Sequence, residues 1–283
     1  MSPAVFIFEY KDQRLVPAKI KAFELHLRQW ITSSTNLELA KNSQFESIIV
    51  QDPDNGMARD AHPPPAPKEL FKPLESFATR FPRVSAPFFQ VVVAAWTLAE
   101  IAVSFAATDI CPSNLSKRII SLLVYSQQPA DAVARASTLT PIFFIGGCMI
   151  IAGSLLRVAC YKILGRLFTY ELSIHNEHKL ITSGPYGFVR HPSYTGAMVF
   201  ASGQYLCMLD ESSWLVACSG LFPRNEYARK SVVWGIRIVM CSTVAVLLRH
   251  RMNEEDAMLE KHFGKEWKDW TKRVPYKIVP WVY

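Results

Sequence analysis

One short segment between two apolar stretches carries the residue types that bind a charged ligand. The segment, GPYGFVRHPSYTG, places Arg190 and His191 directly before Pro192. Proline disfavours helical backbone at the residue before it, so we expect the chain to turn at His191 before the next helix begins. Loose backbone amides, a guanidinium, an imidazole and the phenols of Tyr186 and Tyr194 would suit a ligand with a carboxylate and an aromatic base. A cytosolic loop with ordinary basic residues is the alternative.

A second polar segment, RHRMNEEDAMLEKHFGKEWKDWTKRVP, places one acid among apolar side chains. If the segment is helical, Glu255 lies on an apolar face that consists of Met252, Leu259, Phe263, Trp267 and Trp270. Burying an isolated carboxylate is costly, so Glu255 needs a cation, either Arg251 one turn earlier or one that a ligand brings. An amphipathic helix whose charges are all solvated is the alternative.

Apolar stretches near membrane-spanning length surround these two segments, and half of all residues are hydrophobic. The candidate spans are Phe88–Ala107, Ile142–Leu164 and Val232–Leu248, with shorter stretches at Tyr194–Leu209 and Trp214–Phe222. In lipid the backbone must satisfy its own hydrogen bonds, so these stretches should be helical. The sequence therefore predicts an all-α, polytopic membrane helical bundle with four or five transmembrane helices and a C-terminal cytosolic amphipathic helix.

Some residues of these stretches have specific expected roles. Gly146, Gly153 and other small residues of the second span should let helices approach closely. We expect Asp210–Ser213 to be the turn of a helical hairpin. Arg237 interrupts an apolar span, which indicates either a functional residue or a core ion pair, with Glu100 as one candidate partner.

Composition narrows the class of protein. The net charge is +7, but the basic residues lie at the edges of apolar stretches, which favours a membrane protein over a nucleic-acid-binding one. The six cysteines form no CxxC pair and are typical of small buried apolar residues, so no metal site is expected. Residues 1–83 are mixed, polar and proline-containing, which predicts an N-terminal extension and linker before a membrane domain over 84–283.

Taken together, HKLITSGPYGFVRHPSYTG and the later RMNEEDAMLEKHFGKEWKDWTKRVP resemble the isoprenylcysteine carboxyl methyltransferase family over roughly Ile142 to Pro280. The resemblance implies an enzyme that methylates the C-terminal carboxylate of prenylated cysteine in proteins, with S-adenosyl-L-methionine as cofactor. It also implies prenylated protein C-termini and the lipid bilayer as partners, and the endoplasmic reticulum membrane as location, with both motifs and the C-terminus cytosolic.

The same resemblance assigns roles to individual residues. Catalytic roles fall to Arg251, at a position associated with the prenylcysteine substrate, and to Arg190, which completes the RHP signature. The cofactor would be bound by Ser173, His178, Lys179, Leu180, Ile181, Tyr186, His191, Pro192, Ser193, Tyr194 and Glu255.

Three other functions remain open from the sequence. A phospholipid or other small-lipid methyltransferase shares both motifs in a looser form, and differs in the acceptor. A non-catalytic membrane protein that retains the fold would bind no cofactor. A lipid reductase would use a nicotinamide cofactor, since some sterol reductases have a similar C-terminal architecture, although the sequence contains no GxGxxG.

Overall fold

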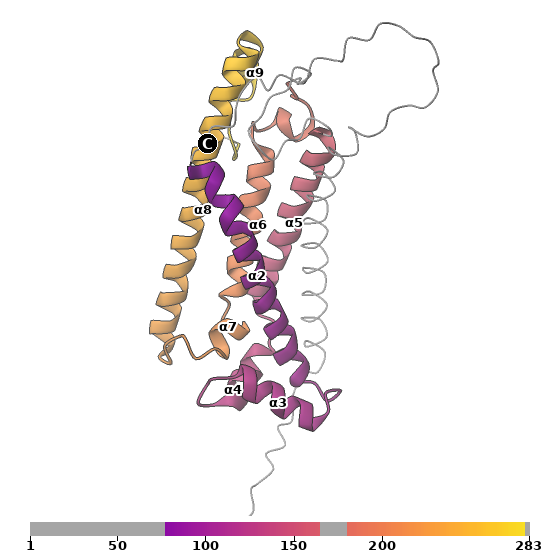
Figure 1. Cartoon of the computed structure of the whole chain (residues 1–283), viewed down its shortest axis with the longest axis vertical. Coiled ribbons are helices and arrows are strands. Elements are labelled where there is room, and N and C mark those ends of the chain that lie inside the picture. The colour runs from indigo at the N-terminus through magenta and orange to yellow at the C-terminus, as the bar shows by residue number, and fades with distance from the viewer. Residues whose placement is uncertain (1–76, 165–179, 281–283) are drawn as a thin grey trace, which may run out of the picture. The chain divides into compact units, whose positions relative to one another are not determined.

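The computed structural model describes residues 77–164 and 180–280, with side chains from residue 88 onward in the first range. Every regular element within these ranges is helical (Figure 1). In chain order the helices are α2 (Phe77–Ala106), α3 (Ser113–Leu123), α4 (Pro129–Ala136), α5 (Pro141–Leu164), the 3-10 helix η2 (Gly184–Gly187), α6 (Pro192–Met208), α7 (Trp214–Ala217), α8 (Glu226–Phe263) and α9 (Lys265–Arg273). The predicted helical class is confirmed, whereas the extension at 1–83 lies almost entirely outside the described residues and stays a prediction.

Three of the described helices are long and apolar enough to cross a membrane: α2 over Phe88–Ala106, α5 and α8. Helix α6 has 17 residues, which gives a length of about 25 Å and falls short of a hydrocarbon core of about 30 Å. Helix α7 has only four residues, so the expected span at Trp214–Phe222 is wrong. Among the described residues, length and composition thus support three spans, where four or five were predicted.

The predicted amphipathic C-terminal helix is not a separate element. It forms the second half of α8, which runs for 38 residues without a break. The break comes at Gly264, whose φ of 53° lies in the left-handed region that favours glycine. This residue ends α8 and lets α9 start in a new direction, so that Trp267 and Trp270 are both buried.

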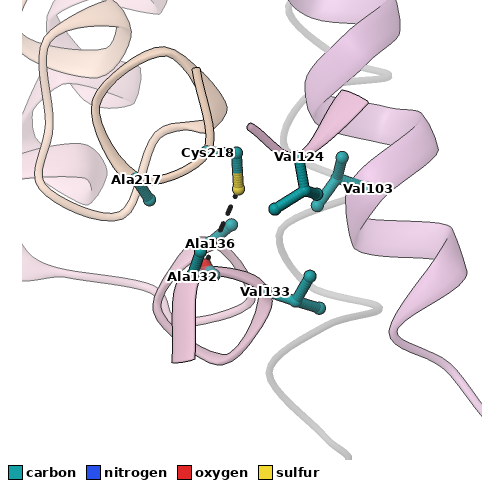
Figure 2. Packing of buried hydrophobic residues seen from close by; sticks show 7 residues of the cluster. All are labelled: Val103, Val124, Ala132, Val133, Ala136, Ala217 and Cys218. Carbon is teal, nitrogen blue, oxygen red and sulfur yellow. Dashed lines mark hydrogen bonds between the residues drawn. The ribbon is translucent and has the colours of Figure 1, made fainter. Parts of the chain in front are cut away.

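The described residues divide into two compact units. Unit 1 contains residues 90–148 and 202–240, and unit 2 contains 77–89, 149–164, 180–201 and 241–280. In unit 1, α4 packs against α7. Figure 2 shows the small core of this region, where Cys218 donates from Sγ to the carbonyl of Ala132 at 3.7 Å, beside Val103 and Val133.

The cysteines follow the sequence prediction in four of six cases. Cys111, Cys160, Cys207 and Cys218 are buried and free, whereas Cys241 is half-buried and Cys148 is exposed. An exposed position at Cys148 agrees with its place on α5, one of the candidate spans, whose outward side chains would face lipid.

Glycines bring α5 and α6 into close contact within each unit. In unit 2, a Cβ on Gly153 would lie 2.6 Å from the carbonyl oxygen of Gly196 and from the amide nitrogen of Phe200. In unit 1, a Cβ on Gly146 would lie 2.9 Å from the carbonyl oxygen of Gly203. The expectation that small residues permit close approach is confirmed at these two positions, but Gly147 has open space around it.

Two buried charges of unit 1 bind backbone groups at helix ends. The carboxylate of Glu100 accepts a hydrogen bond at 2.5 Å from the amide of Trp214, the first residue of α7. The guanidinium of Arg237 donates to the carbonyls of Leu206 and Leu209, at the end of α6, at 3.3 and 2.9 Å. Backbone groups at a helix end have no partner within the helix, so both charges cap the irregular connection between α6 and α7.

Candidate functional site

The segment that contains Arg190 and His191 turns sharply, as its proline predicts. Helix η2 ends at Gly187, and α6 begins at Pro192, where a proline at the first helical position loses no hydrogen bond. His191 is buried, with a relative exposure of 4%. We call Arg190, His191 and Pro192 the corner, because the chain changes direction there into α6.

The backbone amides of the corner are not loose, which corrects the expectation from the sequence. Arg190 donates its amide to the carbonyl of Tyr276 at 2.9 Å, and His191 donates to the carbonyl of Lys277 at 2.8 Å. Thr195 adds a side-chain hydrogen bond from Oγ1 to the carbonyl of Ile278 at 2.7 Å. We call Pro275–Ile278 the strap, because its carbonyls satisfy the corner from a distant part of the sequence.

Helix α8 contributes Asp256, which contacts both charged residues of the corner. Its Oδ1 lies 2.8 Å from Nε2 of His191, and its Oδ2 lies 3.1 Å from Nη1 of Arg190. Lys277 of the strap places its Nζ 3.1 Å from the same Oδ2. Asp256 is buried, with a relative exposure of 7%, and the cations of Arg190 and Lys277 beside it make such burial tolerable.

Arg190 is held from three directions. Beyond Asp256, its Nη2 donates to the carbonyl of Pro275 at 3.2 Å. Its guanidinium carbon lies 5.8 Å from the centroid of the Trp267 ring, within range of a cation–π contact. These contacts fix the corner against α8, α9 and the strap.

Glu255 lies next to Asp256 but differs in its surroundings. Its Oε2 is 3.8 Å from Nδ1 of His191, which is longer than a hydrogen bond. The same oxygen is buried and has no hydrogen-bond partner among the described residues. A buried carboxylate oxygen without a donor is costly, so this atom is suited to a donor that a ligand brings.

Arg251 and Tyr194 lie on the other side of this acid. Nε of Arg251 donates to the hydroxyl of Tyr194 at 2.9 Å, and the Tyr194 phenol also interacts electrostatically with Glu255. The Tyr194 ring lies 5.6 Å from the ring of His191, centroid to centroid. The phenol and the imidazole therefore both lie near the Glu255 carboxylate, and the Arg251 guanidinium is hydrogen-bonded to that phenol.

An apolar cluster packs beneath these polar groups in unit 2. It consists of Cys160, Tyr186, Trp267, Trp270 and Val274, with Leu156, Leu164, Leu180, Ile181, Leu259 and Phe263 packed against it. The predicted apolar side chains are buried or pack against this cluster, and Met252 is fully buried, but they do not share one helix, because Gly264 divides them between α8 and α9. Burial raises the pKa of the Tyr186 phenol well above its usual value, so this side chain stays protonated and neutral.

Most predicted site residues come together in unit 2. Tyr186, His191, Tyr194, Arg190, Arg251 and Glu255 meet as described, Pro192 and Ser193 begin α6, and Leu180 and Ile181 pack against the apolar cluster. Ser173, His178 and Lys179 lie outside the described residues. Sequence reasoning missed Asp256 and the strap. The only signal for Asp256 was its place as the third of three consecutive acids, which could have been paired with the Arg190–His191 segment.

Within the described ranges, no three His, Cys, Asp or Glu side chains are grouped as metal ligands would be. The polar groups of unit 2 are instead a carboxylate, two guanidiniums, an imidazole and two phenols over an apolar base. Such a set offers complementary groups to an organic ligand that carries both charges and an aromatic ring.

Known proteins resemble the chain over this region. Residues 145–222 match the model of the isoprenylcysteine carboxyl methyltransferase family, which includes the corner but not Glu255. A protein-S-isoprenylcysteine O-methyltransferase B from Arabidopsis thaliana is 30% identical over 139 residues, which cover 48% of this chain and 58% of the relative. The resemblance predicted from the sequence is thus confirmed for this part of the chain.

Two further matches are less specific. A delta(14)-sterol reductase from Mus musculus is 30% identical over 105 residues, which cover 37% of this chain and 20% of the reductase. A solved structure of the eukaryotic intramembrane Ras methyltransferase of the isoprenylcysteine carboxyl type matches at 18% identity and a TM-score of 0.37, covering 74% of this chain and 70% of that chain. The chain spans somewhat more than half the length of the curated methyltransferase that it matches.

Proposed function

We propose that this chain is a membrane methyltransferase that esterifies the C-terminal carboxylate of prenylated cysteine in proteins, with S-adenosyl-L-methionine as methyl donor. The single observation that carries the proposal is the meeting of Glu255 with the corner. Its Oε2 is buried without a hydrogen-bond partner among the described residues, 3.8 Å from Nδ1 of His191. The family match over residues 145–222 supports the reaction class.

The arrangement fits the chemical groups of the cofactor. Its α-ammonium would donate a charge-assisted hydrogen bond to Glu255, which offsets the cost of burying that carboxylate. The aromatic side chains of Tyr186 and Tyr194 and the apolar residues Leu180 and Ile181 offer surfaces for the adenine ring. We propose the same role for His191, Pro192 and Ser193, and for Ser173, His178 and Lys179 beyond the described residues.

When bound, S-adenosylmethionine supplies a methyl group on a positively charged sulfur, and the acceptor carboxylate oxygen forms a bond to that carbon as the carbon–sulfur bond breaks. A C-terminal carboxylate is already ionised at neutral pH, so this chain needs no strong base. Its residues must orient two ligands and exclude water, and orientation alone accounts for about 7–11 kcal/mol in favourable intramolecular reactions.

We assign the acceptor carboxylate to Arg251. Its planar guanidinium can bind a carboxylate with two parallel hydrogen bonds, and its Nε contact with Tyr194 orients that plane. The prenyl group would reach the site from the lipid, between apolar helices, whereas the cofactor would enter from the cytosol. We place the protein in the endoplasmic reticulum membrane with both motifs and the C-terminus cytosolic.

The test is radiolabelled methyl transfer by the full chain in membranes, with farnesyl-cysteine and phosphatidylethanolamine as alternative acceptors. We expect transfer to farnesyl-cysteine. Transfer to phosphatidylethanolamine alone would replace this proposal by a lipid N-methyltransferase, whose amine acceptor must first lose a proton. No transfer, with no binding of the methyl donor, would indicate a non-catalytic protein.

Glu255→Gln sharpens the test of the cofactor site. Loss of one charge-assisted hydrogen bond should weaken binding of S-adenosylmethionine by about tenfold to a hundredfold in calorimetry. The matched control is Glu260→Gln, because Glu260 is an exposed acid of the same helix that pairs with Lys268 on the surface. Unchanged affinity in Glu255→Gln would contradict the assignment.

The match to a sterol reductase supports a second candidate, a membrane reductase that uses a nicotinamide cofactor. Binding of NADPH, measured by the change in its fluorescence on addition of the protein, separates the two. We expect no such change.

A further inference from the structure

Asp256 joins three parts of the chain that are far apart in the sequence. It belongs to α8, its partners Arg190 and His191 form the corner, and Lys277 belongs to the strap. The strap in turn accepts the backbone amides of Arg190 and His191. The Asp256 carboxylate therefore holds the side chains of the corner, and the carbonyls of the strap hold its backbone amides.

This arrangement decides which ring nitrogen of His191 faces the candidate ligand site. A carboxylate oxygen only accepts hydrogen bonds, so the 2.8 Å contact with Asp256 requires a proton on Nε2. In the neutral ring Nδ1 is then an acceptor, and it faces Oε2 of Glu255 at 3.8 Å. Two acceptors that face each other across this gap create a site for a group with more than one N–H, such as an alkylammonium.

We propose that Asp256 is a positioning residue of the methyl-donor site: it locks the corner onto α8 so that Nδ1 of His191 and Oε2 of Glu255 together accept the ammonium of the donor. Asp256 acts through His191 and does not itself touch a ligand. Arg190 belongs to the same set of contacts, because its guanidinium interacts with Asp256, the Pro275 carbonyl and the Trp267 ring. The identity of the ligand rests on the proposed function. The position of the proton on the His191 ring does not.

The alternative is that Asp256 merely stabilises the fold, as many buried ion pairs do. A fold-only role predicts that any folded variant binds the donor normally. A positioning role predicts that donor binding and the ring protonation pattern of His191 change together, even in folded protein.

The experiment uses the full chain purified in detergent micelles, with Asp256→Asn and Asp256→Glu as variants. Asp269→Asn is the matched control, because Asp269 is an exposed acid that pairs with Lys272 on α9. We expect Asp256→Asn to raise the Kd of S-adenosylmethionine at least tenfold, Asp256→Glu to recover part of this loss, and Asp269→Asn to stay within twofold of wild type. Wild-type affinity in folded Asp256→Asn would overturn the proposal.

The second measurement is nitrogen NMR of histidine-labelled protein, with the His191 signals identified from their loss in His191→Gln. In wild type we expect a protonated Nε2 and an unprotonated Nδ1, and a redistribution between the two in Asp256→Asn. Should Asp256→Asn fail to fold, the wild-type spectrum decides, and a proton on Nδ1, whether or not Nε2 also carries one, overturns the proposal. If the wild type shows the expected ring but binds no methyl donor, the proposed function fails while the ring assignment stands.

Discussion

Unit 1 and unit 2 both bury charged side chains, and the hydrogen bonds described above for the two sets go to different kinds of group, although Arg237 also lies 4.8 Å from the centroid of the Trp234 ring. In unit 1, Glu100 accepts from a backbone amide, and Arg237 donates to backbone carbonyls. In unit 2, Arg190, His191 and Asp256 contact one another through their side chains, next to a carboxylate oxygen of Glu255 that lacks a hydrogen-bond partner among the described residues.

The difference teaches how to interpret a charge inside an apolar helix. A charge that satisfies backbone groups at a helix end repairs a break in the fold, as the hydrogen bonds of Glu100 and Arg237 do. A carboxylate oxygen that is buried beside an ordered network, yet receives no donor, marks a place where the chain leaves room for another molecule. Stability measurements on four variants test this distinction.

Asp256→Ala should have the largest effect on stability. It removes the common partner of the Arg190 guanidinium and the His191 imidazole, and breaking a buried ion pair costs about 3–5 kcal/mol. Chemical unfolding in mixed micelles, followed by tryptophan fluorescence, measures the change. A loss below about 1 kcal/mol would mean that the corner is held by the strap alone.

Arg237→Leu should come second, with a loss of about 2–3 kcal/mol. The carbonyls of Leu206 and Leu209 would lose a donor at a depth where water is scarce, and each unsatisfied group costs about 1–3 kcal/mol. The same unfolding experiment measures the loss, and donor affinity per folded molecule should stay unchanged. A selective loss of donor affinity would make Arg237 a functional residue after all.

Glu100→Gln should cost about 1 kcal/mol. The amide oxygen of glutamine still accepts from the amide of Trp214, so only the charge assistance of that hydrogen bond is lost. Since the substitution keeps size and shape, Glu100→Ala serves as the comparison and should cost clearly more. Equal losses in the two variants would show that the cap at Trp214 does not depend on this oxygen.

Glu255→Gln should have the smallest effect, within about 0.5 kcal/mol of wild type or slightly stabilising. The oxygen that it neutralises has no hydrogen-bond partner among the described residues, so the folded chain loses little when the charge goes. The stability measurement is made without ligand, so that donor binding does not contribute. A destabilisation as large as that of Asp256→Ala would place Glu255 among the structural charges of unit 2.

The sequence predicted the local features of the candidate site. Pro192 indicated where α6 begins, and the spacing from Met252 to Trp270 indicated the buried face on which Glu255 lies. Both are signals that one stretch of chain carries by itself, through the fixed geometry of proline and the period of a helix.

The missing features depend on contacts between distant residues. The strap has no periodic pattern, and its hydrogen bonds reach residues 83 and 85 positions earlier in the chain. Asp256 is one of three adjacent acids, and nothing local distinguishes it from Glu254. Glu100 and Arg237 bind backbone groups between α6 and α7, so their roles could be predicted only if the ends of these helices were known. Helix α7 is far shorter than its apolar stretch suggested.

The strap also sets an order of events during synthesis. A ribosome that has made the corner must add more than 80 residues before the carbonyls of Pro275 and Ile278 exist. During that interval the amides of Arg190 and His191 lack the carbonyls of Tyr276 and Lys277, which are their partners in the folded chain. The corner therefore reaches its final hydrogen bonding only after the whole of α8 and α9 has been made.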